Sequence, residues 1–196
     1  NFGQNITFSG NARSVANDPA AALHDPAAGN MRGIGLTMEG IEQNPFIYAL
    51  FLENVWRDTP VDLGTFVTEY TTRRYGKTSP TAIAAWNKML PTLYENELTN
   101  GGNESIITGR PTLKRNPEGT TNIRLHYKNR TLVEAWDRMI ACADTLAASD
   151  GFRYDLTDIT RQVLANYASV LQQRFVEALG RHDRNGFEQA AERFLA

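Results

Sequence analysis

Residues 33–44, GIGLTMEGIEQN, have the pattern of a β-strand that runs through a turn into the start of a helix. Side chains of a strand alternate between its two faces, so one face here would be apolar and the other would carry small residues and one acid, Glu39. A face without bulky side chains lets a ligand approach the backbone, and barrel enzymes keep catalytic groups where a strand runs into the next helix. Glu39 is therefore a candidate catalytic carboxylate. On spacing alone, a solvated surface glutamate is the stronger interpretation.

The residues that follow predict a series of helices. Asn44 and Pro45 are typical of a helix N-cap and the first helical position. Residues 46–56 are apolar almost all round, which predicts a buried helix. Asp62 and Ser79 stand at the N-cap positions of two further helices.

Helical patterns also fill the C-terminal third of the chain. Thr131 and Glu134 have the spacing of a capping box, in which each side chain accepts from a free backbone N–H. A long helix is expected over residues 155–179 with Gly180 as its end, and Asp183 is expected to cap a last helix. Residues 1–30, apart from a short helical turn at 20–23, and the polar stretch 100–130 have loop composition.

Composition excludes several classes of protein. The 196 residues carry a net charge of −2, so no basic excess points to nucleic acid or an anionic membrane surface. No apolar run is long enough to span a bilayer. The three histidines are far apart and lack Cys or acidic companions at ligand spacing, so no metal site is expected. The chain does not begin with Met, and its start at Asn1 suggests a fragment.

Two groups of residues each allow two interpretations. Trp56, Trp86 and Trp136 could stack on sugar rings, but their helical spacing within apolar stripes favours the core. The stretch RRY, residues 73–75, could bind an anion, but a solvated helix end with favourable dipole placement is the stronger interpretation.

Several motifs resemble segments of one enzyme family. The stretch MEGIEQNPFIYALFLENVW, residues 38–56, resembles a segment of the alpha-N-acetylglucosaminidases, glycoside hydrolase family 89, with the pattern E-G-I-x-Q-N followed by an apolar helix. Further similar segments occur in the family's order: NFG (1–3), RRYG (73–76), RPTL (110–113), EAW (134–136) and FRYDLTDITRQ (152–162). The resemblance spans most of the chain.

The resemblance implies a fold and a set of site residues. Residues 33–39 would be the last strand of a (β/α)8 barrel, and residues 1–3 would lie at the mouth of the strand before it. The fold class is then mainly α, with a helical bundle-like C-terminal domain over residues 45–196 preceded by the last one or two strands of an incomplete barrel over residues 1–44. Glu39 would be the catalytic nucleophile, and Asn1 and Gln43 would bind the sugar.

The implied activity is the release of terminal α-linked N-acetylglucosamine from a glycan by a retaining mechanism, without a metal or redox cofactor. Such a mechanism needs two carboxyl groups. Glu42 is close in sequence, but a residue just inside a helix start is better explained by the helix dipole, and the family's acid/base glutamate lies on an earlier strand that no segment here matches. The chain alone is therefore expected to be inactive. The resemblance suggests a secreted, periplasmic or lysosomal parent.

A second hypothesis is a non-catalytic helical module that serves as a scaffold or an oligomerisation domain. It accounts for the helices and for the missing second acid, but not for a strand that ends in Glu39. An incomplete barrel would expose strand edges, so the region before Pro45 is expected to be poorly packed, irregular or held by another chain, and an oligomer is possible.

Overall fold

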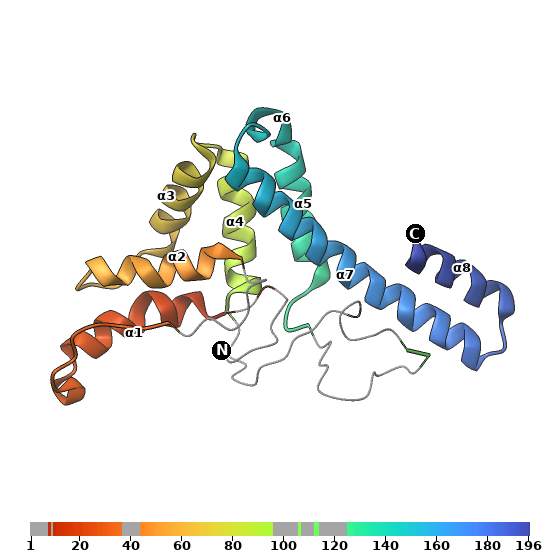
Figure 1. Cartoon of the computed structure of the whole chain (residues 1–196), viewed down its shortest axis with the longest axis horizontal. Helices are drawn as coiled ribbons and strands as arrows, with labels where there is room; N and C mark the ends of the chain where they lie inside the picture. The colour runs from red at the N-terminus through yellow and green to blue at the C-terminus, as the bar shows by residue number, and fades with distance from the viewer. Residues whose placement is uncertain (1–7, 9, 37–43, 96–105, 107–111, 114–124) are drawn as a thin grey trace.

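A computed structural model describes residues 8, 10–36, 44–95, 106, 112–113 and 125–196 (Figure 1). In this part of the chain the elements are α1 (Ala12–His24), η1 (Pro26–Ala28), α2 (Pro45–Glu53), η2 (Asn54–Trp56), α3 (Leu63–Tyr75), α4 (Pro80–Leu93), α5 (Asn129–Ala141), α6 (Ala143–Leu146), α7 (Asp150–Gly180) and α8 (Arg184–Leu195).

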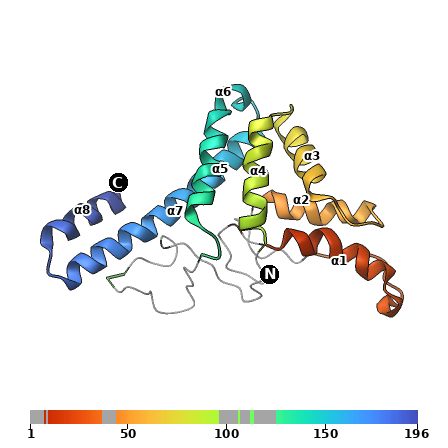
Figure 2. The same cartoon turned by 180° about the vertical axis from the view of Figure 1, so that it is seen from behind.

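The helices form a central body with an extension. The body consists of α1 to α6 and the first half of α7, with α1 packed beside α2 and α4 beside α5 (Figure 2). The second half of α7 leaves the body, and α8 folds back along it. This pair is held in part by the ring of Phe175, which lies 5.9 Å from Phe187 and 5.6 Å from Phe194.

The centre of the body is a cluster of aromatic rings around Phe46, the second residue of α2. Its ring lies 4.9 Å from Trp86, 5.0 Å from Tyr94 and 5.3 Å from Tyr70, measured between centroids. The Phe46 and Trp86 side chains are fully buried. Phe46 follows directly on Asn44 and Pro45. The core therefore fixes the position at which the stretch 33–44 ends and α2 begins.

Local sequence signals correctly place four helix starts. The side chains of Asn44, Asp62, Ser79 and Asp183 each accept a backbone N–H in the first turn of the helix that follows, at 3.0, 2.8, 3.3 and 3.0 Å. Gly76 ends α3 in the left-handed conformation, with φ of 76°. The structure confirms a mainly helical chain with these boundaries.

The expectation of an irregular region before Pro45 is wrong for residues 12–24. They form α1, which Asn11 caps by accepting from Ser14 N–H. Ala12, Ala16 and Ala20 recur every fourth residue and are buried, so a narrow alanine stripe lets α1 approach the body closely. The sequence of this region contains two local turn signals, Asp18-Pro19 and Asp25-Pro26, which account for the expectation of loop. The helix nevertheless continues through the proline of the first pair.

No strand occurs among the described residues. Residues 33–36 have no regular secondary structure, and residues 37–43 lie outside the described part. A strand needs a hydrogen-bonding neighbour, and the described residues offer residues 33–36 none.

Two predicted helix starts are wrong. Helix α5 begins at Asn129, two residues before Thr131, so the capping box does not form; Glu134 instead pairs with Lys88 and Arg130. Helix α7 begins at Asp150 rather than residue 155, with Ser149 as its cap. The predicted end of this helix at Gly180 is confirmed, and the first residue after it with positive φ is His182.

The expectation that residues 46–56 are buried on all sides is also wrong. Leu50 is buried, but Leu52, Val55 and Trp56 expose 55%, 54% and 86% of their surface. The core assignment therefore fails for Trp56. It holds for Trp86, and Trp136 is partly buried against the core, where its indole donates to Thr160 at 2.8 Å.

Candidate functional site

The candidate site residues from the sequence lie outside the described part of the chain. These are the proposed nucleophile Glu39, the proposed sugar-binding residues Asn1 and Gln43, and the neighbouring acid Glu42. The described residue that follows them directly is Asn44. Its side chain enters a buried polar cluster, which consists of Asn44, Arg74, Tyr75, Trp86, Asp155 and Asp158.

Asn44 joins two helices through its carboxamide. The oxygen accepts the N–H of Phe46 at 3.0 Å and so caps α2. The nitrogen donates to a carboxylate oxygen of Asp158 at 3.0 Å and lies 3.4 Å from Asp155 Oδ1, both on α7. The side chain is buried. The amide of Asn44 therefore links the start of α2, through its oxygen, to α7, through its nitrogen.

Asp155 is the centre of the cluster and has no exposed surface. Arg74 binds it with two parallel hydrogen bonds, from Nε at 2.7 Å and from Nη2 at 2.9 Å. This paired geometry is the strong form of an arginine–carboxylate contact. The hydroxyl of Tyr75 donates to Asp155 Oδ2 at 2.9 Å and accepts the indole N–H of Trp86 at 2.7 Å. Residues from α3, α4 and α7 thus converge on one carboxylate.

The electrostatics fit a structural cluster. Burial raises the pKa of Asp155, while the hydrogen bonds from Arg74, Tyr75 and Asn44 act against this rise. Burial lowers the pKa of the Arg74 guanidinium, but the hydrogen bonds and the charge attraction to Asp155, with the nearby Tyr70 and Tyr75, together outweigh that effect, and the pKa is raised. Burial and the nearby carboxylate also raise the pKa of Tyr75. Its phenol therefore keeps its proton and remains a donor.

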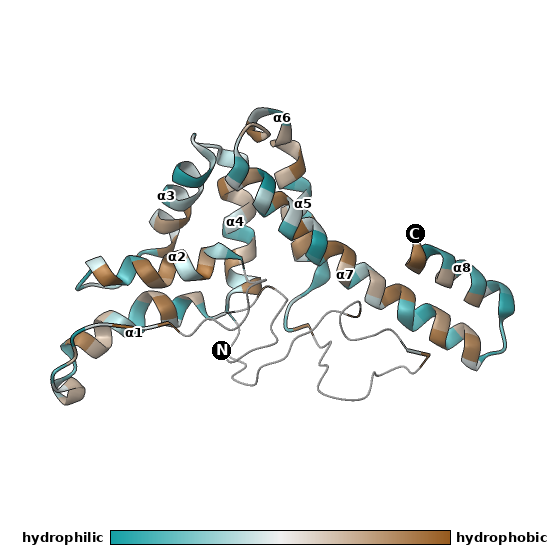
Figure 3. Ribbon diagram, viewed as in Figure 1, coloured by the Kyte–Doolittle hydropathy of each residue, from teal (hydrophilic) through white to brown (hydrophobic). Residues whose placement is uncertain are grey.

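The polar face of α7 continues beyond the cluster. Gln162 donates to Asn166 at 2.9 Å, and the Asn166 amide donates to the hydroxyl of Tyr127 at 3.0 Å and to the Asn129 side chain at 2.8 Å. Burial raises the pKa of Tyr127 to about 12. The same face of α7 thus holds the start of α5 as well as the start of α2. Figure 3 shows polar and apolar residues alternating along this helix.

Sequence reasoning missed this cluster, and two of its interpretations need correction. Arg74 and Tyr75 do not form a solvated helix end: Tyr75 is buried, and the guanidinium of Arg74 is bound to Asp155. Only Arg73 is largely exposed. The segment FRYD, residues 152–155, also predicts an aromatic anchor at Phe152 and a helix cap at Asp155. The ring of Phe152 does lie 5.4 Å from that of Tyr75, but Asp155 lies within α7 and caps nothing.

The acids of the cluster cannot serve as the second catalytic carboxyl. Asp155 is bound by three side chains, and Asp158 accepts from Arg161 at 2.7 and 3.0 Å as well as from Asn44. A general acid must reach the leaving oxygen of a substrate, and neither carboxyl has a free, accessible oxygen to do so.

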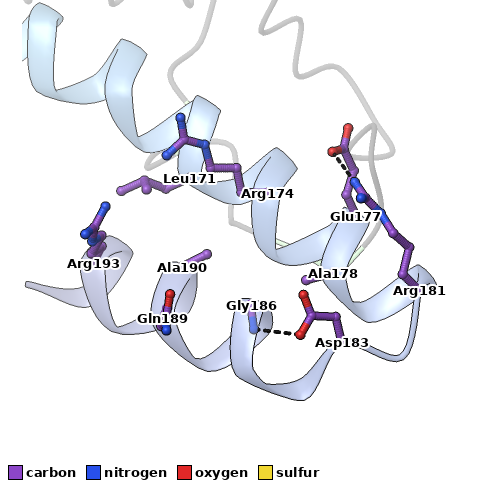
Figure 4. Close-up of a pocket in the computed structure, with 10 residues that line it drawn as sticks. All are labelled: Leu171, Arg174, Glu177, Ala178, Arg181, Asp183, Gly186, Gln189, Ala190 and Arg193. Carbon is purple, nitrogen blue, oxygen red and sulfur yellow. Dashed lines mark hydrogen bonds and ion pairs between the residues drawn. The ribbon is translucent and has the colours of Figure 1, made fainter.

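A hollow of about 250 Å³ lies between α7 and α8 (Figure 4). Its lining includes Arg174, Arg181 and Arg193 and the acids Glu177 and Asp183. Glu177 is paired with Arg181 at 3.2 Å. Twenty residues of helix separate Asp158 from Ala178 at the hollow, which corresponds to about 30 Å. The hollow is therefore separate from the buried polar cluster around Asp155.

The described residues contain neither a metal-binding group nor a membrane-spanning helix. No group of three His, Cys, Asp or Glu side chains there could hold a metal ion. None of the helices in the same residues combines the length and apolarity needed to cross a membrane.

Family models match both parts of the chain. The model described as the alpha-N-acetylglucosaminidase (NAGLU) tim-barrel domain matches residues 1–58, and that of the NAGLU C-terminal domain matches residues 66–196. The human alpha-N-acetylglucosaminidase is 38% identical over 173 residues, which are 87% of this chain and 22% of that protein.

Solved structures from Clostridium perfringens are also similar. A family 89 glycoside hydrolase in complex with 2-acetamido-1,2-dideoxynojirmycin is 29% identical with a TM-score of 0.86 and covers 99% of this chain. A variant with two glutamates replaced by glutamine, in complex with its substrate GlcNAc-alpha-1,4-galactose, is 30% identical with a TM-score of 0.88 and covers all of this chain. The chain spans about a fifth of the length of these relatives, 22% in each case.

The C-terminal-domain model alone matches more than half of the chain, in agreement with the family that the sequence motifs indicate. The chain therefore belongs to the alpha-N-acetylglucosaminidase family, glycoside hydrolase family 89.

Proposed function

We propose that this chain is the end of the catalytic barrel and part of the helical C-terminal domain of a retaining, exo-acting glycoside hydrolase that releases terminal α-linked N-acetylglucosamine. The observation that carries the proposal is the match of both family domains, in the family's order, on the two sides of residues 59–65. We place the end of the barrel part at residue 44 and the helical domain at 45–196; the barrel model extends to residue 58 and so includes α2 and η2.

In this proposal Glu39 attacks the anomeric carbon and forms a covalent glycosyl-enzyme. A second glutamate, from a part of the barrel outside this sequence, protonates the leaving oxygen and then activates water. The relative that was crystallised with its substrate carries two glutamate-to-glutamine substitutions, which supports a mechanism with two carboxyl groups. Asn1 and Gln43 hydrogen-bond to the sugar, and no metal or redox cofactor takes part.

The test uses the polypeptide encoded by the complete reading frame. We expect it to hydrolyse an aryl α-N-acetylglucosaminide, and we expect Glu39→Gln to abolish turnover, while the matched control Glu42→Gln keeps it. Azide added to the Glu39→Ala variant should give the β-glycosyl azide, because azide replaces the nucleophile on the same face of the sugar. Full activity of Glu39→Gln would refute the assignment.

The 196-residue chain alone is expected to be inactive, because it lacks the acid/base. Turnover by this chain that Glu39→Ala abolishes would refute this expectation. The alternative, a non-catalytic scaffold or oligomerisation module, predicts a start codon near Asn1 rather than further strand–helix units and a second catalytic glutamate upstream. Sedimentation analysis of the complete polypeptide tests the oligomer.

A further inference from the structure

Three of the sequence segments that carry the family resemblance meet at one buried point. Asn44 ends the segment that contains Glu39, Arg74 and Tyr75 belong to RRYG, and Asp155 belongs to FRYDLTDITRQ. Their side chains are joined by hydrogen bonds of 2.7 to 3.4 Å although Asn44 and Arg74 are separated from Asp155 by 111 and 81 residues.

We propose that Asp155, acting through Asn44, is a positioning residue for Glu39, so that the helical domain fixes the segment that carries the nucleophile. The inference rests on the function proposed above. Asn44 is five residues after Glu39. Its oxygen is used by α2 and its nitrogen by two carboxylates of α7, so rotation of the amide would break contacts at both ends.

Packing gives this attachment a second point. The ring of Phe46, two residues after Asn44, is fully buried and packs against aromatic rings of α3 and α4 at centroid distances of 4.9 to 5.5 Å. The start of α2 thus has one polar and one apolar anchor two residues apart. Together they hold it against α3, α4 and α7.

Asp155 is itself held rigidly. Arg74 binds both of its oxygens, Tyr75 binds one of them, and Trp86 fixes the hydroxyl of Tyr75. Catalytic groups need second contacts of this kind, because a displacement of about 1 Å lowers a rate by about 100-fold.

The chemistry of the cluster also favours positioning over stability. A buried ion pair can often be replaced by apolar side chains of similar volume without loss of stability. What apolar contacts cannot supply is direction: a hydrogen bond weakens steeply once the donor–hydrogen–acceptor angle falls below about 120°, so four donors on one carboxylate restrict its orientation. A cluster that served only to stabilise the fold would leave the turnover number of folded protein unchanged, which makes the two roles separable.

The experiment uses the complete polypeptide, at a temperature where circular dichroism shows each variant to be folded. Asp155→Asn removes the charge but keeps the shape. Asn44→Ser keeps a good helix cap and loses the amide donor. We expect both variants to lower kcat and kcat/KM equally, by about 10- to 100-fold, with KM nearly unchanged. Asp150→Asn, an exposed acid on the same helix, is the matched control and should keep the wild-type kcat.

A double-variant cycle checks the route. If Asp155 acts through Asn44, the Asn44→Ser/Asp155→Asn protein should be no slower than the slower single variant, whereas independent effects would multiply. Wild-type kcat in folded Asp155→Asn or Asn44→Ser protein would overturn the inference. An inactive wild type, or an active Glu39→Gln variant, would instead overturn the proposed function. If Asp155→Asn fails to fold, the inference is tested on the kcat of Asn44→Ser and Arg74→Lys instead. Both variants keep the Asp155 carboxylate and the positive charge at position 74.

Discussion

Substitution of Arg74 by methionine should destabilise the chain far more than the same change at its neighbour Arg73. Arg74→Met removes two hydrogen bonds, of 2.7 and 2.9 Å, and the positive charge from a carboxylate that has no exposed surface. Removal of one partner from a buried ion pair costs about 3–5 kcal/mol. Arg73 is 59% exposed and lies 3.8 and 3.9 Å from two glutamates, so Arg73→Met should cost about 0–1 kcal/mol.

The double variant Arg74→Met/Asp155→Asn gives the sharper test. With the buried charge gone, only imperfectly satisfied polar groups remain. The loss of unfolding free energy relative to the wild type should therefore fall to about 1–3 kcal/mol. The free energy of unfolding from urea denaturation followed by circular dichroism measures all three proteins. Equal losses for Arg74→Met and Arg73→Met, or a double variant less stable than Arg74→Met, would refute the reasoning.

The pH dependence of the Arg74→Met variant has a definite sign. Burial already raises the pKa of Asp155, and loss of the guanidinium removes a group that opposes this rise. A carboxyl with a raised pKa in the folded state takes up its proton before the unfolded chain does. The difference in unfolding free energy between the wild type and Arg74→Met should therefore shrink as the pH falls from neutrality toward the ordinary aspartate pKa of about 3.9. A deficit that grows over this range would contradict the assignment.

Other expectations concern packing, backbone and titration. Phe46→Ala should cost about 3–5 kcal/mol in urea denaturation, because it empties the centre of the aromatic cluster. Gly151→Ala should lower Tm, because its Cβ would lie 2.5 Å from the backbone oxygen of Arg74, while the matched change Gly180→Ala, with open space around it, should add up to about 1 kcal/mol. Burial lowers the pKa of His126, so its contribution to stability is complete above the ordinary histidine pKa of about 6.5 and is lost as the pH falls through the lower folded value. A flatter pH dependence of Tm in His126→Gln protein checks this.

Helix starts could be predicted from the sequence because they depend on neighbours in the chain. Asn44, Asp62, Ser79 and Asp183 bind backbone N–H groups two or three residues away, so their role can be inferred from a short window. Helix α1 was missed for a related reason. The Asp-Pro pairs are strong local turn signals, whereas the contacts that stabilise α1, such as Ala12 N–H to the carbonyl of Tyr94 at 2.6 Å, come from distant parts of the chain.

The buried polar cluster could not be assembled from the sequence, but one trace of it was present. Asp155, Asp158, Gln162 and Asn166 recur at intervals of three and four residues, which is the spacing of one helix face. A pattern of apolar residues does not reveal such a face. A polar face beside an apolar one on a long helix can nevertheless be buried if other side chains hydrogen-bond to it. The partners here are an amide, a guanidinium and phenols from three other segments. A polar stripe at helical spacing therefore indicates where a chain is held together, and only the structure identifies what it holds: in this chain, the residue that follows the proposed nucleophile by five positions.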